Sequence, residues 1–301
     1  MKKPNLFIVG APKCGTTALS EYLRQHPNVF MTNPKEPNFF SDDMPKRYIS
    51  KTIDDYISLY SKSRKYHYIK GEASVFYLYS SYALQNIYNF NSKAKIIAML
   101  RNPIDLIYSL HSEYLFNFTE DVFDFEKAWR LQADRNGGVS LPKGCKNPKI
   151  LQYKNIAMLG TQVKKLMSIF PEEQVMLILL DDFKNSTKKV YKEVINFLNL
   201  PDNGRKHFPI INENKQYKSR LLGRILHQPS NSIRRISHRL YELLGIDVGE
   251  VILRFISGIN SKHVKRSELS FKMRKELILE FKEDIFLLER IIGKDLSGWL
   301  Q

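Results

Sequence analysis

The sequence predicts an α/β fold in which helices flank a mainly parallel central sheet. Short, wholly apolar runs alternate with segments of helical periodicity, as expected for buried parallel strands and their crossover helices. Each run stops at a glycine or a charged residue, which is typical of a strand that enters a loop. No internal repeat or Gly/Ser linker divides the chain. We therefore expect a single domain over residues 1–301, with an α/β core at 1–200 and a helical, basic extension at 201–301 packed on it.

The amino-terminal half supplies two of the expected strands. Residues 6–9 form a continuous apolar run ended by Gly10, which predicts a buried first strand. Residues 17–25 repeat apolar side chains at helical spacing, so a helix should follow. Residues 96–100 predict a second buried strand, and Pro103 suits the first turn of the helix after it.

The carboxy-terminal half continues the alternation. Residues 175–180 predict a third strand, preceded by a helix that ends near Phe170. Residues 191–198 show helical periodicity again. Beyond Pro201 the chain becomes polar and basic, and helical periodicity returns at 268–292.

Composition excludes several classes of protein. With 43% hydrophobic and 12% aromatic residues, the 301-residue chain is neither disordered nor of low complexity. The longest aliphatic run, 175–180, is far too short to span a bilayer. The run at 6–9 is too short for a signal-peptide core, so we expect a cytoplasmic protein. Two cysteines make neither a disulfide framework nor a four-ligand zinc site, and we expect no metal.

The charge of the chain indicates an anionic partner. There are 47 Lys and Arg against 31 Asp and Glu, a formal net charge of +16. Residues 205–239 contain nine Lys/Arg and one acidic residue, and thus carry +8. This stretch is either a solvated basic face or a rim over a negatively charged ligand. No helix-turn-helix, zinc finger or RNP pattern accompanies it, so we expect no nucleic acid partner.

The loop between the first strand and its helix is the strongest local signal. Residues 10–17 read Gly-Ala-Pro-Lys-Cys-Gly-Thr-Thr. The two glycines allow tight backbone turns, and the N–H groups and dipole of the helix favour a phosphate-like dianion. The spacing of Gly10 and Gly15 is that of a Walker A loop, but Thr16 stands where that motif has lysine, and Lys13 lies inside the loop. The alternative is an ordinary strand–helix joint with capping threonines.

Two motifs together identify a resemblance. Residues 12–19, Pro-Lys-Cys-Gly-Thr-Thr-Ala-Leu, resemble the 5′-phosphosulfate loop of sulfotransferases that use PAPS, 3′-phosphoadenosine 5′-phosphosulfate. Arg101-Asn102-Pro103, with Ser109 eight residues after the arginine, resembles the segment that binds the 3′-phosphate in that family. The resemblance implies a P-loop-like fold, PAPS as co-substrate and PAP, the 3′,5′-bisphosphate, as product. It implies cofactor contacts from Lys13, Cys14, Gly15, Thr16, Thr17, Ala18, Arg101 and Ser109.

Further matches extend over most of the chain. They lie at 35–40, 71–74, 170–174 and 293–299, and they are most similar to the heparan-sulfate-type and bacterial branch of the family. Two departures fall on the acceptor or cofactor-edge side. Ala73 stands where several glycan-modifying relatives have lysine, and residues 157–159 lack a Gly-x-Tyr pattern. The acceptor is expected to be a hydroxyl or an amine of a small natural product or a carbohydrate, and its identity stays open.

Sulfuryl transfer requires charge stabilisation at the leaving phosphate and a base for the acceptor. Lys13 is the expected cation for the bridging oxygen. Glu36 lies in the matching segment 35–40, on a short loop where the resemblance implies the catalytic glutamate of this branch of the family, and glutamate is ordinarily ionised at pH 7. The alternative is a loop carboxylate paired with a neighbouring lysine such as Lys35 or Lys46. His111, two residues beyond Ser109, is the rival base or a packing residue.

Two other functions remain open at this point. A P-loop kinase or nucleotide hydrolase would place Mg²⁺ at Asp181-Asp182, which follow the third predicted strand. A polyanion-binding module would use the basic stretch 205–239 and show salt-sensitive binding independent of Lys13. The sequence does not reveal the oligomeric state.

Overall fold

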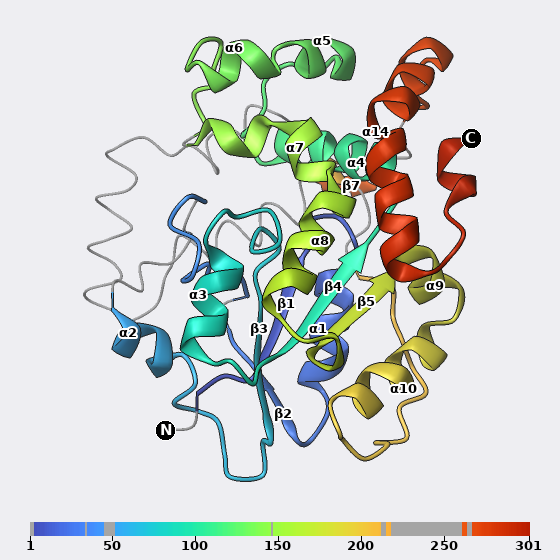
Figure 1. Ribbon diagram of the computed structural model, residues 1–301. Helices are drawn as coiled ribbons and strands as arrows, with labels where there is room; N and C mark the ends of the chain where they lie inside the picture. The colour runs from blue at the N-terminus through green and yellow to red at the C-terminus, as the bar shows by residue number, and fades with distance from the viewer. Residues whose placement is uncertain are drawn as a thin grey trace. The chain divides into compact units, whose positions relative to one another are not determined.

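The central sheet has five parallel strands in the order β2-β3-β1-β4-β5 (Figure 1). The computed structural model describes residues 3–33, 35–44, 52–145, 147–211, 215–217, 261–263 and 267–301. The strands of the sheet are β1 (Leu6–Gly10), β2 (Val29–Met31), β3 (Ile69–Ala73), β4 (Lys95–Leu100) and β5 (Val175–Leu179). The expected α/β fold with a parallel sheet is thereby confirmed.

The centre of the sheet is its most apolar part. All five residues of β1 are buried, and β4 is buried from Ile96 to Leu100. β1 pairs with β3 on one side and with β4 on the other. The connection after β1 leads to β2 on one side of the sheet, whereas the connection after β4 leads to β5 on the other, so the order of the strands reverses between β1 and β4. Ligands of open α/β sheets bind at the carboxyl ends of the strands beside such a reversal.

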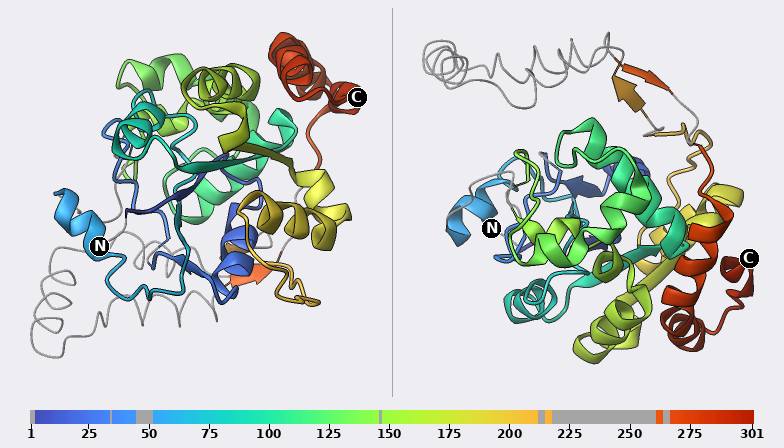
Figure 2. Two further views of the ribbon diagram at one scale, coloured as in Figure 1. Left: turned by 60° about the horizontal axis from the view of Figure 1, so that its bottom comes forward. Right: turned by 90° about the horizontal axis from the view of Figure 1, so that it is seen from above.

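Helices cover both faces of the sheet. In the left view of Figure 2, α1 (Thr16–Arg24) and α10 (Thr187–Phe197) lie on one face, and α3 (Ala83–Phe90) and α8 (Leu159–Ile169) lie on the other. The long α14 (Phe271–Ile292) packs against α8. Further helices are α2 (Ile53–Ser58), α4 (Pro103–Phe116), α5 (Phe125–Arg130), α6 (Gln132–Asn136), α7 (Tyr153–Ala157) and α9 (Leu180–Asn185). Short 3₁₀ turns lie at Pro148–Leu151, Glu172–Gln174 and Ser297–Leu300.

The chain forms two compact units. The first contains Met1–Ile107, Tyr153–Asn212 and Phe271–Gln301, and thus the whole sheet. The second contains Tyr108–Gln152 and Glu213–Ser270, including a small antiparallel pair, β6 (Lys215–Tyr217) and β7 (Ser261–His263). The expected division into 1–200 and 201–301 stays a prediction. Most of the basic stretch 205–239 lies outside the described residues.

Candidate active site

The loop between β1 and α1 has the geometry of an anion cradle. Gly15 immediately precedes α1 with a φ of 85°, in the left-handed region that glycine adopts without steric cost. A side chain there would also meet Leu180, whose Cδ1 lies 3.0 Å from the position of a Cβ. Because Gly15 has no side chain to cap the helix, the first N–H groups of α1 remain directed at the loop. Thr16 and Thr17 open the helix, and Ala18 follows within its first turn.

Arg101 joins the two motifs that the sequence singled out. It follows β4, and its Nη1 donates a hydrogen bond to the backbone oxygen of Lys13 at 3.3 Å. Its Nη2 also lies 3.7 Å from Oδ2 of Asp105, one turn into α4. Ala11 is tied to the same strand, because its N–H donates to the Met99 carbonyl at 2.7 Å. The guanidinium of Arg101 and the loop around Lys13 therefore form one cationic site at the carboxyl ends of β1 and β4.

Asn102 fixes the start of α4 beside this site. Its Oδ1 accepts a hydrogen bond from the N–H of Ile104 at 2.9 Å, and Pro103 occupies the first helical position. Its Nδ2 donates to the carbonyl of Trp299 at 3.2 Å. The Arg-Asn-Pro segment is thus held from both sides.

Cys14 is a packing residue of the loop. Its side chain is fully buried, and Sγ donates to the Pro12 carbonyl at 3.4 Å. Burial raises the pKa of this thiol to about 12, against the opposing effect of Arg101 and Lys13. The thiol therefore stays protonated at neutral pH, which excludes the thiolate that a nucleophilic cysteine needs.

Glu36 lies on the loop after β2. Nζ of Lys35 contacts Oε1 of Glu36 at 2.9 Å, and each side chain keeps 18% of its surface exposed. The salt bridge that the sequence offered as an alternative is therefore present, and the carboxylate is still open to solvent. Glu36 and Asn38 have positive φ values of 63° and 52°, in a region that non-glycine residues adopt at a cost.

A buried carboxylate beneath that loop was not among the site residues predicted from the sequence. Glu72 of β3 has no exposed surface and accepts hydrogen bonds from three hydroxyl groups: Tyr56 at 2.6 Å, Ser74 at 2.6 Å and Tyr77 at 3.2 Å. The available signal was a glutamate within a five-residue strand whose positions are all buried. Such a position requires partners, and the sequence does not show which.

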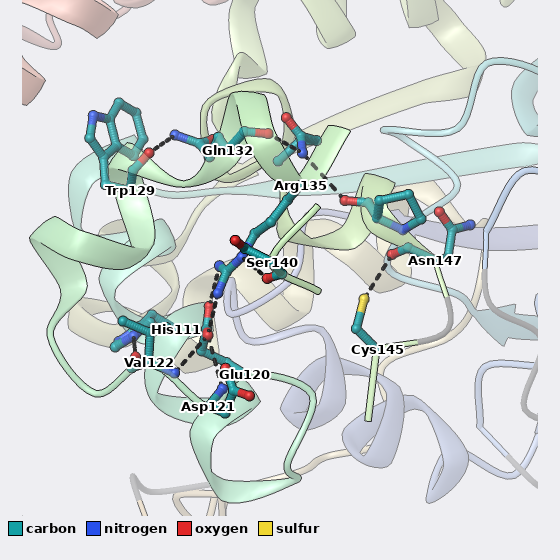
Figure 3. Close-up of polar contacts among 12 residues, drawn as sticks. His111, Glu120, Asp121, Val122, Trp129, Gln132, Arg135, Ser140, Cys145 and Asn147 are labelled. Carbon is teal, nitrogen blue, oxygen red and sulfur yellow. Dashed lines mark hydrogen bonds and ion pairs between the residues drawn. The ribbon is translucent and has the colours of Figure 1, made fainter. Parts of the chain in front are cut away.

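Ser109 and His111 belong to the second unit, on the part of α4 beyond Ile107. Both are buried, and burial lowers the pKa of His111. Nε2 of His111 lies 2.8 Å from the carbonyl oxygen of Val122, which only accepts, so Nε2 carries the hydrogen (Figure 3). The structure thus gives this nitrogen a backbone partner.

The segment that holds Val122 is fixed by an ion pair. Nη1 and Nη2 of Arg135 lie 2.6 and 2.7 Å from the two carboxylate oxygens of Glu120, and both side chains are fully buried (Figure 3). Glu120 Oε1 also accepts from the N–H groups of Asp121 and Val122. A bidentate pair with additional backbone donors compensates its own desolvation, whereas either partner alone would be costly.

The acidic pair considered for Mg²⁺ opens α9. Asp182 Oδ2 lies 2.7 Å from Nζ of Lys294, near the carboxyl end of the chain. Asp181 is close enough to influence the thiol of Cys14 electrostatically. Within the described ranges, no group of three or more His, Cys, Asp and Glu side chains is arranged to hold a metal ion.

Comparison with known proteins places the chain in a family. The model of the family described as "Sulfotransferase domain" matches residues 3–235. "Carbohydrate sulfotransferase 15" of Mus musculus is 25% identical over 251 residues, which cover 65% of this chain and 44% of that protein. "Heparan sulfate glucosamine 3-O-sulfotransferase 5" of Homo sapiens is 25% identical over 201 residues, with 66% and 54% covered. The chain spans about half the length of these curated relatives.

A solved structure agrees with the family match. A sulfotransferase from Alicyclobacillus acidocaldarius superposes with a TM-score of 0.72 at 26% identity, and each chain is covered completely. No helix in the described part of this chain is long and apolar enough to cross a membrane. The family model covers most of the chain and includes both the loop at 10–17 and the Arg-Asn-Pro segment. The chain therefore belongs to the sulfotransferase domain family, whose enzymes use PAPS.

Proposed function

We propose that this protein transfers the sulfuryl group of PAPS to a hydroxyl or an amine of a carbohydrate or a small natural product. The observation that carries the proposal is the contact between Arg101 and the Lys13 carbonyl. It joins the loop that suits a 5′-phosphosulfate to the segment that suits a 3′-phosphate. The kinase alternative is set aside, because the chain belongs to a sulfotransferase family and Asp182 is paired with Lys294.

The residues present fit such a co-substrate. The uncapped N–H groups of α1 and the guanidinium of Arg101 offer donors to two separate anionic groups. PAPS, when bound, supplies an activated sulfuryl group and a phosphate leaving group. Lys13 is the cation that balances the negative charge on the bridging oxygen, and its charge acts most strongly in the transition state, where that oxygen carries most charge.

Glu36 is the proposed base. Its partial exposure permits access to an acceptor hydroxyl, and the neighbouring Lys35 keeps the carboxylate in place. His111 is the weaker candidate, since it is buried and its Nε2 already bonds a backbone carbonyl. No covalent intermediate is required, because in-line transfer to a positioned acceptor suffices.

A glycan is the acceptor class that the relatives favour, since their names specify carbohydrate and heparan sulfate. Ala73 stands where several glycan-modifying relatives have lysine, so the acceptor of this chain is expected to differ from theirs. An acceptor screen with PAPS, covering oligosaccharides, phenols and amines and read by mass spectrometry for an added sulfuryl group, tests this part. A cytoplasmic location also remains a proposal, which immunoblotting of cell fractions tests.

The assignment of the co-substrate is tested by calorimetry with PAP and AMP. The wild-type protein should bind PAP much more tightly than AMP, because Arg101 holds the 3′-phosphate. Arg101→Ala should weaken PAP binding by about 10- to 150-fold, the equivalent of roughly 1.5–3 kcal/mol for a charge-assisted hydrogen bond, and leave AMP binding nearly unchanged. Equal affinity of the wild-type protein for PAP and AMP would contradict the assignment.

The assignment of the base is tested by a pair of variants. Glu36→Gln keeps the size and polarity of the side chain, but it cannot accept the proton, so turnover should fall by roughly 10²–10⁴ at unchanged PAP affinity. His111→Ala is the comparison variant, with PAP affinity as the control for folding. A fully active Glu36→Gln beside an inactive, correctly folded His111→Ala would transfer the role to the histidine.

A further inference from the structure

Glu72 is a buried carboxylate that the proposed mechanism does not use. Tyr56 and Tyr77 donate to its Oε1 at 2.6 and 3.2 Å, and Ser74 donates to its Oε2 at 2.6 Å. A carboxylate oxygen only accepts, so each hydroxyl directs its single hydrogen at Glu72. The hydroxyl oxygens can then only accept further hydrogen bonds, and the direction from which they accept is fixed.

Two of these three hydroxyls hold the loop that carries Glu36. The backbone N–H of Asn38 donates to Oγ of Ser74 at 3.1 Å. The backbone N–H of Phe40 donates to the Tyr77 hydroxyl oxygen at 3.3 Å. Each hydroxyl thus forms a relay, accepting from the loop backbone and donating to the same carboxylate. The anchored amides lie two and four residues beyond Glu36.

The loop needs such anchors because its backbone is strained. Glu36 and Asn38 both have positive φ, a conformation that persists in non-glycine residues only when the surroundings enforce it. Asn38 and Phe40 are buried, and a buried N–H group that has lost its water costs free energy unless it finds an acceptor in the protein. The hydrogen bonds through Ser74 and Tyr77 restrain this backbone and also give the two buried N–H groups their acceptors.

We propose that Glu72 is a positioning residue, which fixes the loop that carries Glu36 through the hydroxyl groups of Ser74 and Tyr77. The proposal rests on the proposed function, in which Glu36 is the base. Glu72 itself touches no reacting atom, since it is fully buried beneath the loop. It acts by setting which way two hydroxyl groups point.

The groups that face Glu72 make this arrangement dependent on pH. They are Tyr56 and Tyr60 from α2 and the residues after it, Ser74 and Tyr77 beyond β3, and Glu36 on the loop. Burial raises the pKa of Glu72 to about 7, the charge of Glu36 raises it further, and the hydrogen bonds from Ser74, Tyr56 and Tyr77 oppose the shift. Once protonated, Glu72 becomes a donor, so a hydroxyl that takes its hydrogen must reverse, and a relay is lost where that hydroxyl belongs to Ser74 or Tyr77.

The relays can be tested by removing one hydroxyl at a time. Ser74→Ala and Tyr77→Phe each delete one relay, whereas Tyr56→Phe is the matched control. Tyr56 donates to the same carboxylate and is equally buried, and among the contacts described its hydroxyl bonds only Glu72 and Tyr60. Ser74→Thr keeps a hydroxyl and is the conservative rescue.

The first measurement is hydrogen–deuterium exchange of the peptide that covers 35–44, followed by mass spectrometry. We expect exchange in this peptide to rise by roughly 3- to 10-fold in Ser74→Ala and Tyr77→Phe, the loss of about one hydrogen bond, and to stay near wild type in Tyr56→Phe. Unchanged exchange in Ser74→Ala and Tyr77→Phe, or an equal rise in Tyr56→Phe, overturns the proposal. If Tyr77→Phe does not fold, Ser74→Ala with its Ser74→Thr rescue carries the test.

The second measurement separates this proposal from the role of Glu36. With PAPS and the acceptor that the screen identifies, kcat of the two relay variants should fall about 3- to 10-fold while calorimetric PAP affinity is unchanged. The wild-type kcat should rise as pH increases through 7, and Glu72→Gln, which cannot ionise, should lack this rise. If Glu36→Gln proves fully active, the assignment of Glu36 as the base is wrong, but the exchange experiment still decides whether Glu72 holds the loop.

Discussion

At the scale of single residues, two buried ionisable side chains behave differently because their partners differ. Cys14 and Glu72 are both without exposed surface. The thiol has one weak hydrogen bond to a carbonyl, and burial keeps it neutral, with a pKa raised to about 12. Glu72 has three hydroxyl donors, which partly offset burial and leave its pKa at about 7. Only Glu72 therefore changes its charge in the physiological range.

This pKa makes the stability of the sheet-containing unit depend on pH. The folded-state value of about 7 lies above the ordinary value of 4.5, so the folded state binds more protons between these limits. The contribution of Glu72 to the free energy of unfolding is therefore most favourable below pH 4.5. It decreases by up to about 3 kcal/mol as the pH rises through 7. The free energy of unfolding, measured with urea, should change in favour of Glu72→Gln relative to the wild-type protein when the pH is raised from 5 to 8. A difference independent of pH would contradict this assignment.

At this scale the sequence could predict the two loops proposed to bind the nucleotide, but not the residues that hold the proposed base. Lys13, Arg101 and their loops follow from local motifs, since a strand, a tight loop and a helix start lie within one short segment. The anchors of Glu36 do not, because Ser74 and Tyr77 lie more than thirty positions further along the chain. Their convergence depends on the pairing of β2 with β3, which local patterns do not encode.

At the scale of elements, α8 obtains its amino-terminal cap from another helix. Its own N-cap residue, Met158, offers no capping side chain. Asp284 of α14 instead accepts from the N–H of Gly160 at 2.7 Å and from both the N–H and the hydroxyl of Thr161 at 2.8 and 2.7 Å. Gly160 permits this approach, because a Cβ there would lie 2.2 Å from the Asp284 carbonyl oxygen.

Removal of this cap should destabilise the first unit. Asp284→Ala leaves the buried N–H of Gly160 and the part-buried N–H of Thr161 without their acceptor and removes a carboxylate from the positive end of α8, which costs about 1–3 kcal/mol. Thermal unfolding should show a midpoint lower by several degrees. Glu283→Ala, at an exposed position of the same helix, is the control and should unfold near the wild-type temperature. Equal midpoints for Asp284→Ala and Glu283→Ala would rule out a capping role.

Elements with an apolar pattern were the ones that the sequence could predict. β1, β4 and β5 lie within one residue of the runs at 6–9, 96–100 and 175–180. β2 is only three residues long, and β3 reads Ile-Lys-Gly-Glu-Ala, so neither shows an apolar run. In β3, hydrogen bonds from the hydroxyl groups of Tyr56, Ser74 and Tyr77 make the burial of Glu72 possible, and a pattern of local hydropathy does not register such side-chain partners.

At the scale of the whole molecule, the excess of positive charge is the dominant electrostatic property. The net charge of +16 attracts anions over a range set by the salt concentration. The proposed co-substrate is an anion, while many hydroxyl acceptors are neutral. Charge should therefore affect the encounter with PAPS much more than the transfer step.

Salt should consequently lower kcat/KM for PAPS and leave kcat nearly constant. An increase from about 50 to about 300 mM NaCl shortens the screening length by more than half, so long-range attraction is largely removed. Initial rates with a neutral acceptor at several PAPS concentrations measure both parameters, and potassium glutamate in place of NaCl controls for specific chloride binding. A kcat that falls in parallel with kcat/KM would contradict an effect confined to the encounter.

The hydrogen bond between Asn102 and the Trp299 carbonyl has a consequence for biosynthesis. Because translation proceeds from the amino terminus, the strands β1 to β5 emerge from the ribosome well before residues 284 and 299. Until then the Arg-Asn-Pro segment lacks one of its two anchors, and α8 lacks its cap from Asp284. A nascent chain can thus form most of the sheet early, yet the segment that carries Arg101 gains its second anchor only after residue 299 has been added.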